Sequence, residues 1–234
     1  MALIYYITAR AQLEAETGSD AASGSEQALR EKVQAAFSAG VDTVQVREKD
    51  LPDGRLARLV EDLGSLRAKT ERAKTVPEKT GPEKAVSRWL GRLLARLLIN
   101  ERLDIALSCG ADGVHLPSDS LPLSAVRSRV GPDAVVGISC HTGEEVEHAA
   151  RDGADYALLG PVFETPSKPG GRPLGLALLE DICRSSALPV FALGGVTREN
   201  AASCVRAGAS GIAGIRLFQQ APDLEDLCRY LHSL

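Results

Sequence analysis

Basic and polar side chains follow several short apolar runs in this sequence, and together they could bind an anion and move a proton. The segment QVREK, residues 45–49, places Gln45, Arg47 and Lys49 on one face if it is extended, because side chains alternate along a strand. Two neighbouring cations repel each other, so an anion is their natural ligand. We therefore expect this face to bind a negatively charged group.

Two later apolar runs end in residues of the same kinds, the first at His141 and the second in the loop 160–171. Within that loop, Thr165, Ser167 and Lys168 offer two hydroxyl groups and an ammonium group to phosphate oxygens. The imidazole of His141 is suited to proton transfer near neutral pH. These residues add an acid–base group to the expected anion site.

Glycines follow the last two apolar runs, at Gly194, Gly195 and Gly214. Glycine lets backbone N–H groups approach a ligand closely, and the corresponding corner of a parallel barrel commonly binds phosphate. We therefore expect two anionic groups in one pocket, the first near the basic side chains named above and the second near these glycines.

These residues can form one site only if the fold places the ends of their strands close together. The order of the apolar segments predicts such a fold. Short β-rich runs alternate with segments of helical periodicity. The expected strands are Leu3–Ile7, Thr43–Arg47, Leu94–Ile99, Gly113–Leu116, Val135–Ile138, Tyr156–Leu159, Val190–Leu193 and Gly211–Ile215. The expected helices are Glu26–Ala39, Pro52–Leu66, Leu123–Val130, Gly143–Asp152, Leu176–Cys183, Thr197–Ala207 and Leu224–Leu231.

This alternation predicts the α/β class and a single (β/α)8 TIM barrel, with residues 1–234 forming one domain. A doubly wound open sheet is the alternative, but no G-x-G-x-x-G follows the first strand and no Walker A motif occurs. The tripeptides Gly-Ala-Asp and Gly-Ala-Ser recur before strands, and we interpret them as architecture, with glycine ending each helix.

Two segments interrupt the alternation. Residues 14–25 are rich in glycine, serine, alanine and acidic residues, which predicts a flexible loop after the first strand. Residues 68–91 contain two prolines and many charges, and we expect a solvated insertion between the second helix and the third strand. In a barrel, that position lies on the face opposite the active site.

Composition excludes several classes of function. The chain has 27 basic and 31 acidic residues, a net charge of -4, which gives no basic surface for nucleic acid. No apolar run approaches the roughly 18 residues of a membrane span. The five cysteines are scattered without metal-like spacing, so we expect reduced thiols in a cytoplasmic protein. Only 4% of residues are aromatic, which predicts an aliphatic core. Whether the chain forms a homodimer is left open.

Six segments, in this order, resemble the superfamily of thiamine phosphate synthases and TenI-type thiazole tautomerases. They are VQVREKD (44–50), LLIN (97–100), GADGVHL (110–116), GISCHT (137–142), GADYALLGPVFETPSK (153–168) and ALGGVTREN (192–200). The resemblance covers almost the whole chain outside 14–25 and 68–91.

For the synthase, the resemblance implies that a pyrimidine diphosphate ionises, pyrophosphate leaves, and the nitrogen of a thiazole phosphate captures the carbocation. To the pyrimidine and its diphosphate it assigns Gln45, Arg47, Lys49, Asn100, Ser139, Thr165, Ser167 and Lys168. To the thiazole phosphate it assigns the backbone at Gly175, Gly194, Gly195 and Gly214. His141, Ser139 and Lys168 are the expected catalytic residues.

The resemblance also implies Mg²⁺ at the departing pyrophosphate, and here the chain departs from the family pattern. The synthases usually have Asn-Asp after the third strand, where this chain has Asn100-Glu101. Their second acid lies five residues beyond the histidine of the fourth strand, where this chain has Ser120, with Asp119 one position earlier. Glu101 and Asp119 are therefore the expected metal ligands.

Two other functions remain open. A tautomerase would isomerise a thiazole carboxylate phosphate with His141 as its acid–base group and without a metal. A non-catalytic member of the family would only bind thiazole phosphate. The basic and hydroxyl residues of 45–49 and 165–168 are more than either function requires, so we favour the synthase.

Overall fold

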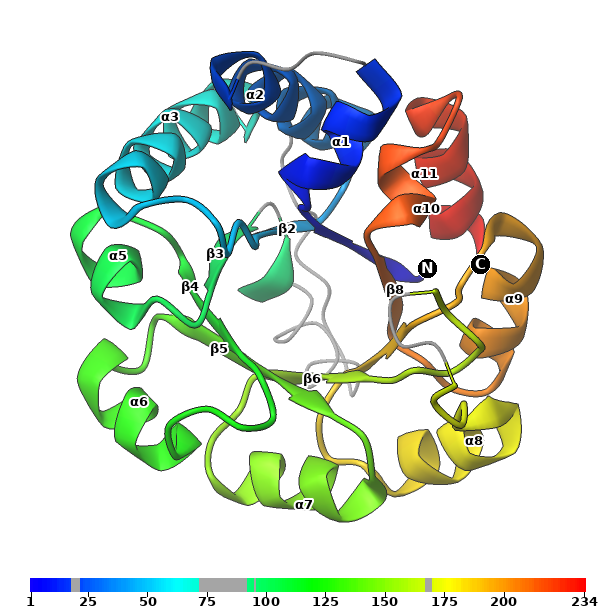
Figure 1. The fold of residues 1–234 in the computed structure, drawn as a ribbon. Coiled ribbons are helices and arrows are strands. Elements are labelled where there is room, and N and C mark those ends of the chain that lie inside the picture. Colours follow the sequence, from blue (N-terminus) through cyan, green and yellow to red (C-terminus); the bar gives the residue numbers. More distant parts are fainter. Residues whose placement is uncertain (18–21, 72–91, 95, 167–169) are drawn as a thin grey trace.

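The computed structural model describes residues 1–17, 22–71, 92–94, 96–166 and 170–234, and its strands form a closed barrel. Eight parallel strands follow one another in chain order, and β8 pairs with β1. The strands are β1 (Leu3–Ile7), β2 (Thr43–Val46), β3 (Arg96–Asn100), β4 (Gly113–Leu116), β5 (Val135–Cys140), β6 (Tyr156–Leu159), β7 (Val190–Leu193) and β8 (Gly211–Gly214). Figure 1 looks along the barrel, with the strands inside a ring of helices. The predicted TIM barrel is confirmed.

Helices connect successive strands on the outside of the barrel (Figure 1). They are α1 (Arg10–Thr17), α2 (Ala22–Ala39), α3 (Asp53–Glu71), α5 (Leu103–Ser108), α6 (Leu123–Val130), α7 (Gly143–Arg151), α8 (Gly175–Ser185), α9 (Arg198–Arg206), α10 (Arg216–Gln219) and α11 (Leu224–Ser233). All seven expected helices are present: α6 has the expected bounds, and the ends of the others are displaced by a few residues. The helices α1, α5 and α10 were not expected.

The two interrupting segments differ from expectation where the structure describes them. Residues 14–17 belong to α1 and residues 22–25 to α2, so the prediction of a loop over 14–25 was wrong there, and residues 18–21 lie outside the described part. Residues 14–16 are the helix formers Glu, Ala and Glu, and in α2 the helix formers that follow residue 25 outweigh the single glycine, Gly24. Residues 68–71 extend α3, and the rest of the expected insertion, 72–91, lies outside the described residues.

Two hydrophobic layers build the core. Mostly aliphatic side chains, together with Tyr6, Phe37 and Phe218, fill the space between the strands and the helices, close to the prediction of an aliphatic core. Inside the barrel, however, the rings of Tyr5, Tyr156 and Phe191 pack together with centroids 5.4 to 5.6 Å apart. Glycine makes room for these rings, because a Cβ atom on Gly137 would lie 1.9 Å from Tyr156 Cζ and one on Gly211 would lie 2.6 Å from Phe191 Cε1. The barrel interior is therefore aromatic at its centre.

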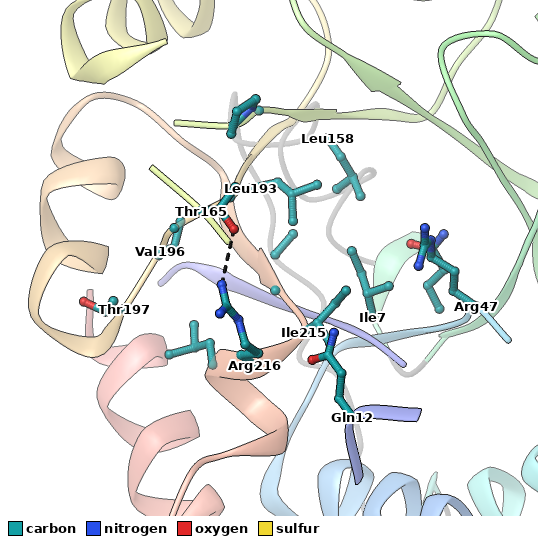
Figure 2. Close-up of a pocket in the computed structure, with 18 of the residues that line it drawn as sticks. Ile7, Gln12, Arg47, Leu158, Thr165, Leu193, Val196, Thr197, Ile215 and Arg216 are labelled. Carbon is teal, nitrogen blue, oxygen red and sulfur yellow. Dashed lines mark hydrogen bonds between the residues drawn. The ribbon is translucent and has the colours of Figure 1, made fainter. Parts of the chain in front are cut away.

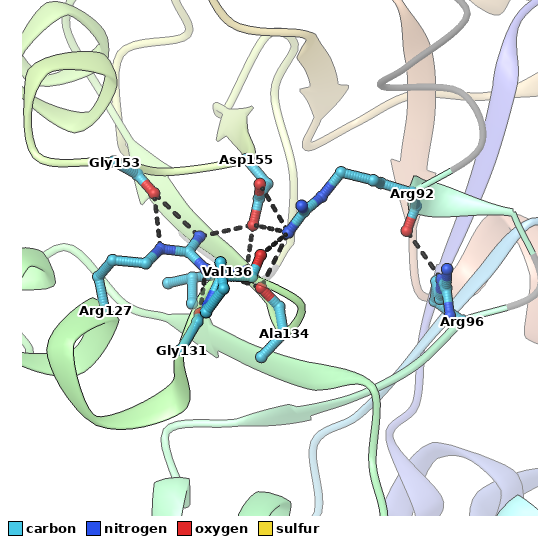
Figure 3. Close-up of polar contacts among 9 residues, drawn as sticks. Arg92, Arg96, Arg127, Gly131, Ala134, Val136, Gly153 and Asp155 are labelled. Carbon is cyan, nitrogen blue, oxygen red and sulfur yellow. Dashed lines mark hydrogen bonds and ion pairs between the residues drawn. The ribbon is translucent and has the colours of Figure 1, made fainter.

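Aspartates directly before three strands link neighbouring strands at the lower rim of the barrel, which is the end where the strands begin. Asp42, Asp112 and Asp155 each accept a hydrogen bond of 2.8 Å from a backbone N–H of the preceding strand, at Ile4, Leu97 and Val136 respectively. Figure 3 shows Asp155 between the guanidinium groups of Arg92 and Arg127. These contacts agree with the architectural interpretation of the recurring tripeptides and leave the opposite rim for chemistry.

Candidate active site

A cavity of about 1490 Å³ opens at the upper rim, where the strands end. Most ligand pockets enclose about 300–1,000 Å³, so this one has room for two small molecules side by side. Figure 2 shows part of its wall, with Arg47 and Arg216 on opposite sides and Ile7 and Ile215 between them. The predicted site residues that line the cavity are Gln45, Arg47, Lys49, Asn100, Asp119, Ser139, His141, Thr165, Gly194, Gly195 and Gly214.

Four predicted residues are not among those that line the cavity. Ser167 and Lys168 lie outside the described residues. Gly175 begins α8, and its N–H donates a hydrogen bond of 3.0 Å to the carbonyl of Val162. The carboxylate of Glu101 accepts a hydrogen bond of 2.8 Å from the amide of Asn100.

Hydrogen bonds at the ends of β1 and β2 hold Arg47 at the cavity. The N–H of Arg47 donates to Thr8 Oγ1 at 3.0 Å, and the Thr8 hydroxyl donates to Glu48 Oε1 at 2.5 Å. The other oxygen of Glu48 accepts a hydrogen bond of 2.9 Å from the N–H of Arg10. Burial raises the pKa of Glu48, and the hydrogen bonds from Thr8 and Arg10 oppose that shift. Buried Glu48 thus links the segment after β1 to the segment after β2. These bonds fix the backbone from which the side chains of Arg47 and Lys49 extend.

Arg216 is a cation of the cavity that sequence reasoning missed. It is the first residue of α10, two positions after the last residue of β8, and its guanidinium donates a hydrogen bond of 3.3 Å to Thr165 Oγ1 (Figure 2). The rule that selected Arg47, a cation directly after a strand, would have found it. The expected strand ran to Ile215, but the short helix after it was not recognised.

The loop between β6 and α8 reaches Arg216 because glycines lie beneath it. Gly194 and Gly195 have φ values of +91° and +66°, which glycine adopts without strain. A Cβ atom on Gly195 would lie 2.3 Å from the carbonyl oxygen of Glu164, and one on Gly194 would lie 2.6 Å from Pro161 Cβ. The two glycines are therefore required for the loop to cross the end of β7 and place Thr165 in the cavity.

His141 lies on the cavity wall with one ring nitrogen engaged by the backbone. Its Nδ1 lies 2.5 Å from the carbonyl oxygen of Gly160, which can only accept a hydrogen bond. Nδ1 therefore carries a proton, and in the neutral ring Nε2 is the basic nitrogen. The backbone N–H of His141 also donates to Glu145 Oε2 at 2.5 Å, which fixes the residue at the end of β5.

A continuous chain of hydrogen bonds runs from the rim through the barrel interior and back to the cavity. It consists, in order, of Glu101, Asn100, Gln45, Tyr5, Tyr156, His115 and Ser139. Its successive donor–acceptor distances are 2.8, 2.9, 3.3, 2.7, 3.0 and 2.9 Å. Burial lowers the pKa of His115 to about 3, and the positive charge of Arg47 adds to this effect. His115 is therefore neutral in the folded protein.

Two carboxylates on neighbouring strand ends are the candidate ligands of a metal ion. Asp119 is exposed on the cavity wall after β4, and Glu101 is half exposed after β3, with Lys49 Nζ 3.7 Å from its carboxylate. Within the described residues, no three or more His, Cys, Asp or Glu side chains gather to enclose a metal. Mg²⁺ is commonly held by only one or two carboxylates together with substrate phosphates, and Asp119 on the cavity wall is placed for that mode.

Comparisons with known proteins point to one family. The model of the thiamine monophosphate synthase family matches residues 65–218. A thiamine-phosphate synthase of Roseiflexus castenholzii is 40% identical over 91% of this chain and 83% of its own length. A second, from Roseiflexus sp., is 38% identical over 92% of this chain and 82% of its own. Among solved structures, a thiamine phosphate pyrophosphorylase of Pyrococcus furiosus has a TM-score of 0.74 and 26% identity, covering 99% of this chain and 94% of that one.

Proposed function

The chain belongs to the thiamine monophosphate synthase family, and from this premise we propose that it is a thiamine-phosphate synthase. This enzyme, a transferase, joins hydroxymethylpyrimidine diphosphate to thiazole phosphate and releases pyrophosphate. The observation that carries the proposal is the single cavity with Arg47 on one side and Arg216 on the other (Figure 2). Two separated cations suit two substrates that each bring an anionic group.

The pyrimidine diphosphate takes the side of Arg47 and Lys49. The bond between the pyrimidine methylene carbon and the diphosphate oxygen breaks, and both electrons leave with the diphosphate. Negative charge therefore grows on the departing group, and fixed cations stabilise the transition state more than the bound substrate. The bonds that fasten the backbone of Arg47 to Thr8 hold the cation in place before the charge develops.

The thiazole phosphate takes the side of Arg216. The guanidinium can bind two phosphate oxygens at once, and Thr165 adds a hydroxyl beside it. We place Thr165 with this phosphate and not with the diphosphate, to which the resemblance assigned it. The backbone at Gly194 and Gly195 lines the same part of the cavity. With its phosphate held there, the thiazole nitrogen faces the carbon that the diphosphate leaves.

Apolar side chains between the two anion sites protect the reaction from water. Ile7, Leu158, Leu193 and Ile215 line the cavity between Arg47 and Arg216 (Figure 2). A carbocation formed over this surface meets the thiazole nitrogen before it meets a water molecule. His141, with Nε2 as its basic nitrogen, is placed to exchange a proton at the cavity wall.

We further propose that Asp119 and Glu101 hold Mg²⁺ together with the diphosphate. Held by these two carboxylates, the ion would supply positive charge where the diphosphate departs. Glu101 is also hydrogen-bonded to Asn100, which orients its carboxylate toward the end of β3. Removal of Mg²⁺ with a chelator should therefore stop coupling while leaving the binding of thiazole phosphate intact.

The experiment that tests the function incubates the purified protein with both precursors and Mg²⁺ and quantifies thiamine phosphate and pyrophosphate. We expect equal amounts of the two products, and neither product when the thiazole phosphate is omitted. Isomerisation of thiazole carboxylate phosphate without coupling would instead identify a tautomerase. Binding of thiazole phosphate with neither reaction would identify a non-catalytic member of the family.

Three further predictions concern the chain as a whole. The five cysteines, all within the described residues, form no disulfide bond, which suits a reducing compartment, and we propose the cytoplasm. Among the described residues, no helix has both the length and the apolar content that crossing a membrane requires. We also propose that residues 1–234 form one domain, and a homodimer stays a prediction.

A further inference from the structure

Arg216 lies at the start of α10, a helix of only four residues that has two buried side chains, Phe218 and Gln219. An isolated helix of one turn is not stable in water, so contacts with the rest of the fold decide where α10 lies. Phe218 is fully buried, and its ring centroid lies 5.8 Å from that of Tyr6 in β1. Gln219 is 4% exposed. The position of Arg216 at the cavity therefore depends on how these two side chains are held.

The amide of Gln219 reaches the segment that follows β1, beside which α10 lies (Figure 1). Its Nε2 donates a hydrogen bond of 3.0 Å to the carbonyl oxygen of Ala9, which is 210 positions earlier in the sequence. A carbonyl can only accept, so this contact fixes the orientation of the amide. The apolar contact of Phe218 has no preferred direction, whereas a hydrogen bond restricts both a distance and an angle. The bond to Ala9 therefore sets the position of α10 more narrowly than packing does.

Residues 8–10 are hydrogen-bonded on their other side to the segment that carries Arg47. The N–H of Arg47 donates to Thr8 Oγ1 at 3.0 Å, and the N–H of Arg10 donates to Glu48 Oε2 at 2.9 Å. Glu48 also accepts a hydrogen bond from the hydroxyl of Thr8. Residues 8–10 are thus joined to the segment after β2 by several hydrogen bonds and to α10 by the amide contact described above.

The second polar atom of the Gln219 amide, Oε1, is buried and has no hydrogen-bond partner among the described residues. A buried polar atom without a partner lowers stability, which offsets what the hydrogen bond to Ala9 contributes. Methionine has a similar length and would remove both effects, while the carbonyl of Ala9 would keep the hydrogen bond of 2.9 Å that it accepts from the N–H of Gln12. Glutamine at this position therefore adds little net stability to the fold, but it does fix α10.

From these contacts we infer that Gln219 is a positioning residue that sets the separation between Arg47 and Arg216. Both arginines are tied to residues 8–10, Arg47 through its own backbone and Arg216 through the short helix that ends in Gln219. Gln219 is not among the described residues that line the cavity, so it acts on a ligand only through Arg216. The inference rests on the proposed function, in which the two arginines on opposite sides of the cavity bind two anionic groups (Figure 2).

Amide hydrogen exchange tests the inference without any substrate. The N–H groups of Phe218 and Gln220 donate to carbonyl groups at the start of α10, and Gln219→Met should speed their exchange by about tenfold. Exchange in the neighbouring helices α9 and α11 should not change, and the midpoint of thermal unfolding should stay within about 2 °C of the wild-type value. Unchanged exchange in α10, or faster exchange throughout the protein with a lower midpoint, would overturn the inference. Neither result depends on whether the protein couples the two precursors.

Calorimetric titrations with thiazole phosphate and with inorganic pyrophosphate then test the effect on the site. Gln219→Met should weaken thiazole phosphate binding by about tenfold and keep pyrophosphate affinity within about twofold, because Arg47 retains its own hydrogen bonds. The matched control is Gln27→Met on α2, where an exposed glutamine donates a hydrogen bond of 2.8 Å to Glu31. This control should change neither affinity. Equal affinity of the wild-type protein and Gln219→Met for thiazole phosphate, or an equal loss in Gln27→Met, would overturn the inference. Tight binding without coupling would count against the proposed function alone.

Discussion

Two arginines on the cavity wall, Arg47 after β2 and Arg216 at the start of α10, are the cations that we propose bind the two anionic groups. Both are half-buried, and Figure 2 shows apolar side chains between them. A hydrogen bond to a charged group contributes about 1.5–3 kcal/mol, which corresponds to roughly 10- to 150-fold in affinity. Each arginine should therefore affect one substrate and spare the other.

Replacing Arg47 with alanine should lower kcat/KM for coupling by about 100-fold, because the departing diphosphate loses a fixed cation. The KM for thiazole phosphate should stay within about threefold of the wild-type value. Steady-state kinetics with each substrate varied in turn measures both quantities. Arg184→Ala is the control, because that side chain is 67% exposed on α8. A selective rise in the KM for thiazole phosphate would contradict the placement of Arg47.

Arg216→Ala should show the reverse pattern. The KM for thiazole phosphate should rise by roughly 10- to 100-fold, since its phosphate loses the guanidinium beside Thr165. The KM for the pyrimidine diphosphate should change little. Arg216→Lys, which keeps the charge but not the paired donors, should recover only part of the loss. An unchanged KM for thiazole phosphate in both variants would remove Arg216 from the site.

At the scale of the elements, the lower rim of the barrel depends on buried aspartates that link neighbouring strands. Asp155 is 5% exposed and connects the N–H of Val136 in β5 to the guanidinium groups of Arg92 and Arg127 (Figure 3). Those contacts lie at the strand beginnings, away from the cavity. The stability of the fold and the chemistry of the site are thus divided between the two rims.

Asp155→Ala should lower the free energy of unfolding by about 3 kcal/mol, because it leaves two buried or half-buried cations and a backbone N–H without their acceptor. Urea denaturation measures the change. Activity at low temperature should persist. Asp181→Ala on the exposed face of α8 is the control and should change the free energy of unfolding by less than about 0.5 kcal/mol. Equal stability of the two variants would contradict the structural role of Asp155.

Local patterns predicted the elements well because each strand of a closed parallel barrel is a short apolar run between turn signals. Four strands, among them β1 and β6, begin and end where they were expected. The short helices α5 and α10 escaped prediction because one turn or two carry too little periodicity to recognise. Strand ends identified Arg47 and His141, because a side chain directly after a strand of a barrel must reach the upper rim.

The interior of the site could not be predicted in the same way. Tyr5 and Tyr156 belong to apolar runs and look like core residues, which they also are. Their hydrogen bond of 2.7 Å joins residues 151 positions apart in the sequence, so it follows from barrel closure and not from a local pattern. Gly137 has no side chain, and this leaves the space in the barrel interior that the ring of Tyr156 occupies.

For the molecule as a whole, the buried imidazole of His115 limits stability in acid. Its pKa is lowered to about 3 in the folded protein, mainly by burial, while an unfolded chain gives histidine a pKa near 6.5. Between these values the unfolded state binds a proton that the folded state does not. The contribution of the neutral His115 to the free energy of unfolding is therefore fully present above about pH 6.5. It decreases as the pH drops below that value, by about 1.4 kcal/mol per pH unit for one proton.

Replacing His115 with glutamine should remove that part of the pH dependence. We expect the free energy of unfolding of the wild-type protein to fall more steeply between pH 6 and pH 4 than that of His115→Gln, by about 1.4 kcal/mol per pH unit. Denaturant unfolding at several pH values compares the two slopes directly. The absolute stability of the variant is not the readout. Parallel curves for the two proteins would show that His115 takes up a proton in the folded state.

The central claim is that one cavity holds two anionic ligands at the same time, at Arg47 and at Arg216. Calorimetric titration of thiazole phosphate into the protein with Mg²⁺, with and without saturating pyrophosphate, tests it most directly. Pyrophosphate occupies the first site, so we predict that one equivalent of thiazole phosphate still binds, with an affinity within a few fold of that for the free protein. Loss of thiazole phosphate binding in proportion to the pyrophosphate added would mean one shared site and would contradict this account.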